Sequence, residues 1–230
     1  MKTTSATLSF DQTFEGFLTA VHTAFAENLE LIDLRPSGDH GALLFSEVRH
    51  IRADRQKAQQ VWEALSQKGT ADLRLVYFAF LSEKEELYFP IYEYLRLLFK
   101  AELPESSHKF QVLRTRLACW AQRVESEKRR LEASLRLQSQ YGEFRCCRLC
   151  PRYDVLPLLT RYCRIHYGSE PWMLIDTKRR YGLRKRATGI ERFPLSVEGS
   201  GMQETSAQNL RRQSEATMAP QAVHSLQAAV

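Results

Sequence analysis

Hydrophobic residues recur every seven positions in one long stretch, and this spacing limits what the chain can fold into. The repeat consists of Phe110, Leu117, Val124 and Leu131, with Leu113 and Trp120 three residues after the first two. Such spacing predicts a helix over residues 108–137 whose apolar seam packs against other helices. The remaining faces of this helix are basic and carry Lys109, Arg114, Arg116, Arg123, Lys128, Arg129 and Arg130. Two interpretations stay open for this basic face, a solvated surface or a surface that follows phosphates.

The periodicity of the whole chain predicts an α+β fold, a mainly helical domain with a small, largely antiparallel sheet. Five shorter helices are predicted over residues 13–28, 54–69, 73–83, 87–103 and 154–168. Strands are predicted at residues 7–10, as a strand–turn–strand within 29–52, and at 143–150 and 172–186. We expect one sheet that combines the N-terminal strands with the later ones.

Composition separates the end of the chain from the rest. Residues 194–230 are rich in Ser, Gln and Ala and poor in large apolar side chains, so they lack the material to bury a core. The prediction is a single domain over residues 1–193 and a mostly disordered tail over 194–230.

The cysteine count and the lack of long apolar runs bear on the compartment. Five cysteines, two of them adjacent, do not form the even, spaced set of a secreted disulfide framework. No run approaches the roughly 20 apolar residues that span a bilayer, and the N-terminal sequence MKTTSATLSF has no signal-peptide pattern. We therefore expect a cytoplasmic protein that does not enter a membrane.

Four thiol and imidazole side chains have a spacing typical of zinc ligands. They follow the pattern Cys147-x2-Cys150-x12-Cys163-x2-His166, and structural zinc takes four such ligands, often as two closely spaced pairs. In an extended strand, however, Cys147 and Cys150 point to opposite faces, and a domain of this size folds without a metal. We predict no metal and no cofactor, with the four-ligand zinc site as the alternative.

Charge is distributed unevenly along the chain. Residues 1–108 hold 11 Lys and Arg against 16 Asp and Glu, whereas residues 109–192 hold 20 against eight. The second part therefore suits a polyanion such as a nucleic acid. The alternative is that the two parts attract each other, or that the charges are solvated.

The most basic segment, KRRYGLRKR, is the predicted nucleic-acid-binding site. Guanidinium groups bind phosphates in pairs of hydrogen bonds, a tyrosine ring can stack on an unpaired base, and Gly182 would allow a tight turn. The predicted binding residues are Lys178, Arg179, Arg180, Tyr181, Arg184, Lys185 and Arg186. A hairpin tip of this composition would suit single-stranded or distorted DNA. The alternative is a basic hairpin that stays solvated or docks on the acidic part of the chain.

A single carboxylate beside this segment is the only catalytic candidate. Asp176 precedes Lys178 by two residues and lies near Tyr181 in the sequence. Buried and paired with Arg179, it would be structural; poised in a pocket with Arg179 and Tyr181, it could act in catalysis.

Several short motifs resemble a known family. They are FDQTFEGFLTAV from Phe10, KAQQVW from Lys57, YFAFLSE from Tyr77, YDVLPLL from Tyr153 and PWMLIDTKRRYGL from Pro171. The chain resembles a bacterial family of uncharacterised DNA metabolism proteins, encoded beside a radical-SAM protein and sometimes fused to a uracil-DNA-glycosylase-like domain. In that family the strand corresponding to RCCRLC has no cysteines, which implies that a zinc site is not a family property.

Three functional hypotheses follow from these observations. The first is an accessory protein of DNA repair or modification that contacts DNA and, as the resemblance implies, acts with a radical-SAM protein. The second is an enzyme that acts on nucleic acid with a pocket around Asp176, Arg179 and Tyr181. The third is a protein-interaction module without DNA affinity. Whether the protein is an enzyme stays open at this point.

Overall fold

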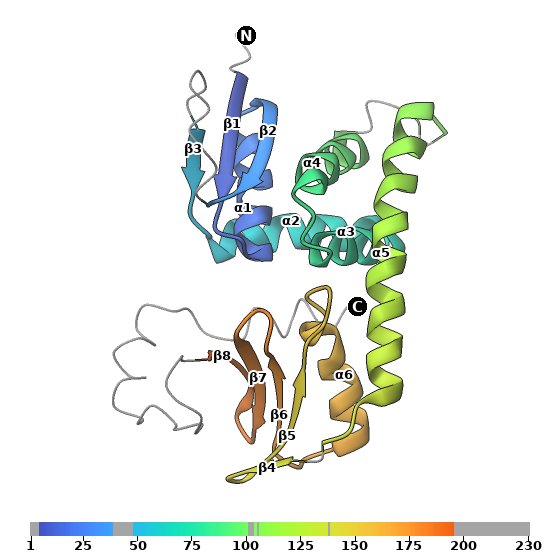
Figure 1. Ribbon diagram of the computed structural model, residues 1–230. Helices are drawn as coiled ribbons and strands as arrows, with labels where there is room; N and C mark the ends of the chain where they lie inside the picture. The colour runs from blue at the N-terminus through green and yellow to red at the C-terminus, as the bar shows by residue number, and fades with distance from the viewer. Residues whose placement is uncertain (1–4, 39–47, 101–103, 105, 138, 196–230) are drawn as a thin grey trace. The chain divides into compact units, whose positions relative to one another are not determined.

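The computed structural model describes residues 5–38, 48–100, 104, 106–137 and 139–195 (Figure 1). Contacts between residues divide the chain into two units, of which the first ends at Glu125 and the second begins at Ser126. This boundary lies within the long helix α5 (His108–Ser134). The predicted disordered tail lies outside the described residues from position 196 onward. That residues 1–193 fold as one domain stays a prediction.

A three-stranded parallel sheet begins the first unit. Strands β2 (Glu30–Pro36) and β3 (Val48–Ile51) pair on either side of β1 (Ser5–Phe10), in the order β2-β1-β3. Helix α1 (Phe14–Ala26) connects β1 to β2, and such a crossover lets consecutive strands run parallel. The predicted strands are present, and β2 and β3 each pair with β1 rather than with each other.

Three helices and an aromatic core complete the packing around this sheet. They are α2 (Arg55–Lys68), α3 (Thr70–Leu81) and α4 (Glu85–Lys100), and Pro90 lies inside α4. The rings of Phe17 and Phe80 lie 5.5 Å apart, and those of Phe10 and Tyr88 lie 5.1 Å apart. Aromatic pairs at such distances stabilise a core, so these aromatics pack the interior.

Helix α5 has the seam that the heptad spacing predicts. Its four seven-residue positions, Phe110, Leu117, Val124 and Leu131, are all buried. Part of its basic face is neutralised within the protein: Lys109 pairs with Glu93 at 3.0 Å and Lys128 with Glu132 at 3.2 Å. The basic face therefore supplies fewer unpaired cations than its sequence suggests.

A five-stranded sheet forms the second unit. Its strands, in the order β4-β5-β6-β7-β8, are β4 (Ser139–Tyr141), β5 (Phe144–Leu149), β6 (Trp172–Asp176), β7 (Tyr181–Arg186) and β8 (Gly189–Pro194). Only β5 and β6 are parallel, and α6 (Leu156–Tyr167) connects them. The α+β class and the largely antiparallel sheet are confirmed. The expectation of a single sheet was wrong, because the N-terminal strands form their own, and β8 was not predicted.

The two faces of the second sheet differ in what covers them. Helix α6 lies beside the second sheet (Figure 1). Lys185 pairs with Trp172 and donates to the carbonyl of Gly168 directly after α6, which indicates that α6 covers the face of Trp172 and Leu174. Alternation along the strands turns other side chains to the opposite face. Four of them, Phe144, Cys146, Met173 and Ile175, form a small apolar cluster against which Tyr141, Phe193 and Leu195 pack.

None of the helices within the described ranges is long and apolar enough to cross a membrane.

Candidate nucleic-acid interface

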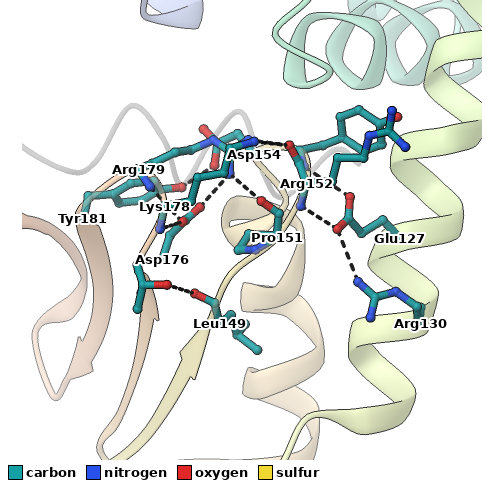
Figure 2. A network of polar contacts seen from close by, with 12 residues as sticks. Glu127, Arg130, Leu149, Pro151, Arg152, Asp154, Asp176, Lys178, Arg179 and Tyr181 are labelled. Atoms are coloured by element: carbon teal, nitrogen blue, oxygen red, sulfur yellow. Dashed lines mark hydrogen bonds and ion pairs between the residues drawn. The ribbon is translucent and has the colours of Figure 1, made fainter.

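The predicted binding segment begins at the carboxyl end of β6, where Asp176 organises a tight turn (Figure 2). The Asp176 side chain is fully buried, and one of its oxygens accepts the backbone N–H groups of Lys178 and Arg179, both at 2.9 Å. Its other oxygen pairs with Nη1 of Arg179 at 2.8 Å. The Asp176–Arg179 ion pair is thus present, with every bond directed inward. Both carboxylate oxygens are occupied, which favours a structural role over a catalytic one.

Two cations of the segment are bonded to the backbone of the neighbouring loop. The guanidinium of Arg179 donates to the carbonyls of Pro151 at 3.2 Å and Arg152 at 3.0 Å. The ammonium of Lys178 donates to the Arg152 carbonyl at 2.9 Å. These bonds tie the turn after β6 to the loop after β5, which is the adjacent parallel strand (Figure 2). Arg179 is therefore a structural residue, while Lys178 remains exposed beyond its bond.

A buried glutamate holds the same loop from the other side. Glu127 of α5 accepts the backbone N–H groups of Arg152 at 2.6 Å and Tyr153 at 3.1 Å, and it also pairs with Arg130 (Figure 2). The sequence analysis did not identify Glu127, although a signal was present. Glu127 lies three residues after Val124, at a seam position where an apolar residue is expected.

Tyr181 does not offer a free ring for stacking. Its side chain is buried, its hydroxyl donates to a carboxylate oxygen of Asp154, and the guanidinium of Arg192 lies 4.0 Å from its ring centre. Burial, and after it the Asp154 carboxylate, raise the pKa of Tyr181 well above its usual value. Helix α6 begins after Val155 without a side-chain cap.

The turn before β7 lies earlier in the chain than predicted, and Gly182 is not part of it. The positive φ belongs to Arg180, at +57°, whereas Gly182 lies inside β7. A Cβ at Gly182 would lie 2.3 Å from Cζ of Phe193 and 2.9 Å from the carbonyl oxygen of Leu174. Gly182 is therefore required for close packing between strands, and the expectation that it makes the turn was wrong.

Strand alternation separates the remaining three predicted residues. Arg184 and Arg186 lie on the face of the apolar cluster, and Lys185 lies on the α6 face. The guanidinium of Arg184 pairs with Glu191 at 3.0 Å and lies 5.5 Å from the ring centre of Phe193. Arg186 extends over the ring of Phe144, also at 5.5 Å. Each of these guanidinium groups thus lies over an aromatic ring, as Arg192 does over Tyr181.

Exposed cations gather around the network at the carboxyl ends of β5 and β6. They are Arg152, Lys178, Arg180 and Arg192. The contacts already described join them: Lys178 bonds to the backbone of Arg152, and Arg192 covers Tyr181, the residue after Arg180. We call these four residues the basic edge. Of the seven residues predicted from the sequence, the four from Lys178 to Tyr181 lie at this end of β7, and Arg184, Lys185 and Arg186 lie along the strand.

The four residues of the alternative zinc site do not converge. Cys163 is buried in α6, where burial raises the pKa of its thiol to about 12, while Cys150 is exposed. The His166 ring stacks on Tyr162 at 3.9 Å. In the part of the chain that the structure describes, no three His, Cys, Asp or Glu side chains are grouped so that they could hold a metal ion.

Comparison with known proteins places the chain in a family defined by its later part. The fold and the site define the class as an α+β protein whose second unit is strongly basic. Residues 85–219 match the family described as "Domain of unknown function (DUF4130)", and the chain belongs to that family. The match includes α5, the whole second sheet and the basic edge.

Other comparisons add little to this assignment. No curated protein matches the chain. Among solved structures, the crystal structure of RecJ in complex with Mn2+ from Thermus thermophilus aligns with 8% identity and a TM-score of 0.43. The alignment covers 98% of this chain and 52% of that one, so this chain spans about half the length of RecJ.

Proposed function

We propose that this protein is an accessory protein of DNA repair or modification that binds single-stranded or distorted DNA through its second unit. We further propose that it acts together with a radical-SAM protein. Only the resemblance described above supports the second statement. The first rests on the electrostatics of residues 126–195.

The observation that carries the proposal is how the carboxylates of this region are used. Residues 126–195 contain 16 Lys and Arg but only seven Asp and Glu. Six of the seven carboxylates bond to donors inside the unit, namely Glu127, Glu132, Asp154, Glu170, Asp176 and Glu191. Acids engaged in this way leave an excess of positive charge at the surface, which attracts a phosphate backbone.

The basic edge is the proposed contact for the backbone. Backbone hydrogen bonds to Glu127 and Asp176 hold Arg152 and Lys178 in place, and all four side chains are exposed to a phosphate backbone. Arg179 and Tyr181, which hold the network together, are assigned to its structure rather than to DNA. The geometry of Asp176 equally weakens the alternative of an enzyme centred on this carboxylate.

Fluorescence anisotropy with a labelled single-stranded oligonucleotide tests the proposal. We expect affinity to fall steeply with salt, because each phosphate contact contributes about 0.7 to the slope of log K against log [salt] for single strands. Replacing Arg152 and Arg180 with Gln should weaken binding and reduce this slope. The matched control is Arg52→Gln with Lys68→Gln, which removes the same charge from exposed positions of the first unit.

Two outcomes would overturn the proposal. The first is a wild-type protein without salt-dependent affinity for any single-stranded or mismatched oligonucleotide. The second is an equal loss of binding in both double variants, which would show a general charge effect rather than a site. A pull-down with the radical-SAM protein tests the partner separately, and binding to that protein without DNA affinity would favour a protein-interaction module.

A further inference from the structure

We infer that a hollow at the β4–β5 hairpin binds one unpaired nucleotide of the DNA strand, with its base on Tyr141 and its phosphate on Arg186. This inference rests on the proposed function and extends it to a site that the sequence analysis did not identify. The hollow has a volume of about 520 Å³ and is lined by Tyr141, Gly142, Glu143, Phe144 and Arg186. Pockets for small ligands have about 300–1,000 Å³, and the hollow is of this size.

The hairpin brings two aromatic residues together. Tyr141 and Phe144 are directly paired across β4 and β5, with Gly142 and Glu143 as a two-residue loop. Gly142 has a φ of +57°, as the first central position of a type II′ hairpin turn requires. Directly paired residues of antiparallel strands have their side chains on the same face. Tyr141 and Phe144 are therefore neighbours, and both line the hollow.

The register of β6 explains why the hollow exists. Strand β6 begins at Trp172, which pairs with Arg145 on one side and with Lys185 on the other. Phe144 and Arg186 each lie one residue beyond these pairs, at the level of Pro171, whose carbonyl accepts the backbone N–H of Arg145. From there Arg186 extends over the Phe144 ring. An arginine at the margin of the sheet is thus held beside an aromatic pair.

The hydrogen bonding of Arg186 is incomplete. Its Nε is shielded from solvent and has no hydrogen-bond partner within the described part of the chain. Buried donors of this kind are rare in folded proteins, and an ordered water or ion is one of their explanations. Because Arg186 lines the hollow, a phosphate oxygen there would provide an acceptor for its guanidinium, although Nε itself is shielded.

Glu143 argues for a nucleotide rather than a free anion. Its carboxylate also lines the hollow, and it is the one acid of residues 126–195 that the bonds described above do not engage. A carboxylate would repel an isolated phosphate but accepts hydrogen bonds from the amino group of a base such as cytosine. The arginine would bind the phosphate, the aromatic ring would stack on the base, and the carboxylate would accept from the amino group of that base.

The hollow also lies in line with the basic edge. Strand β7 connects them, since Tyr181 follows the edge residue Arg180 and Arg186 ends at the hollow. Six residues of strand span roughly 17 Å, and Arg184 lies between the two on the face of the hollow. A single strand bound at the basic edge would pass from the α6 face, where Arg192 covers Tyr181, to the face of Arg184 and the hollow.

The test uses the full chain and a single-stranded oligonucleotide that contains 2-aminopurine, whose fluorescence is quenched when the base stacks. We expect binding to quench the wild-type complex. Tyr141→Ala should abolish the quenching and weaken binding about fivefold or more, whereas Tyr141→Phe should retain both. Arg186→Gln should reduce the salt slope by about 0.7. Arg161→Gln, an equal charge loss at an exposed position of α6, is the control.

The possible failures of the two proposals are distinguishable. If the wild-type protein binds DNA with the expected salt dependence but Tyr141→Ala keeps its quenching and affinity, this site is wrong and the proposed function stands. If the wild-type protein binds no DNA, both are wrong. Circular dichroism and thermal unfolding of each variant exclude a folding defect. If Tyr141→Ala does not fold, Arg186→Gln keeps the test decisive, because an unchanged salt slope in that variant would contradict the proposed phosphate contact.

Discussion

Replacing Asp176 with Asn tests whether this carboxylate holds the fold or performs chemistry. Asn keeps the size of the side chain and one acceptor oxygen for the backbone N–H groups of Lys178 and Arg179. It removes the charge opposite the Arg179 guanidinium, whose Nη1 lies 2.8 Å from the carboxylate. The variant therefore isolates the ion pair from the turn geometry.

The expected loss of stability can be estimated from burial. Removing one partner of a buried ion pair typically costs about 3–5 kcal/mol, because the remaining charge is left uncompensated. Asp176 is fully buried and the Arg179 side chain is 11% exposed, but Arg179 keeps its bonds to two backbone carbonyls. We therefore expect a value near the lower limit, about 3 kcal/mol, which for a chain of this length corresponds to a decrease in Tm of roughly 6–12 °C.

The assay is urea unfolding monitored by circular dichroism. Arg179→Met and the double variant complete a double-mutant cycle with Asp176→Asn. Coupling of about 0.5–3 kcal/mol is expected between residues in direct contact. The control is Glu132→Gln, which breaks a more exposed ion pair of α5 and should cost no more than about 1 kcal/mol.

Two results would refute the reasoning. The free energy of unfolding of Asp176→Asn could lie within about 0.5 kcal/mol of the wild-type value, as it does for ordinary surface substitutions. In that case the network would not stabilise the second unit. If the variant were more stable than the wild type, the carboxylate would be under strain, as functional groups often are, and the enzyme hypothesis would regain support.

Further substitutions and conditions test other parts of the structure. Gly182→Ala should destabilise the protein by about 1–3 kcal/mol in urea unfolding, since the new methyl group overlaps Phe193, and Phe193→Leu in the same chain should restore part of the loss. Because the pKa of Tyr181 is raised on folding, its contribution to stability is complete below its unfolded pKa of about 10 and is lost as pH rises further. Unfolding measured from about pH 9 to about pH 12 should show this loss in the wild type and less of it in Tyr181→Phe. Ellman's reagent should modify the exposed Cys119 and Cys150 quickly, and Cys163 only after unfolding, because burial raises the pKa of that thiol to about 12. Elemental analysis of purified protein should find no stoichiometric zinc, and a zinc content near one per chain would establish the alternative site.

The spacing of hydrophobic residues, together with the residues that begin and end helices, was sufficient to predict most elements. The seven-residue spacing predicted α5, and Gly69 and Gly168 mark the ends of α2 and α6 as expected. Thr13 and Asp54 cap α1 and α2 through backbone N–H groups. These features are local, so a single sequence contains the information.

Strand pairing and side-chain partners were harder to predict because they depend on contacts far apart in the chain. Nothing near Asp154 in the sequence indicates that its partner is the hydroxyl of Tyr181, 27 residues away. Similarly, Arg152 and Glu127 lie 25 residues apart. The hollow beside Arg186 depends on where β6 begins relative to both of its neighbours, which only the register of three strands determines.

The segment from Lys178 to Arg186 shows why charge alone does not identify a binding residue. Arg179 closes a buried ion pair, Arg184 pairs with Glu191, and Lys185 turns to the α6 face. Substituting all the arginines together would therefore combine a lost contact with a damaged turn, and weaker DNA binding by such a variant would not locate the site. Arg180 and Arg186 lie at opposite ends of β7, and neither is part of the Asp176 network. If a strand follows β7, the two single substitutions to Gln should each weaken binding, and only Arg186→Gln should also reduce the quenching of a base held in the hollow.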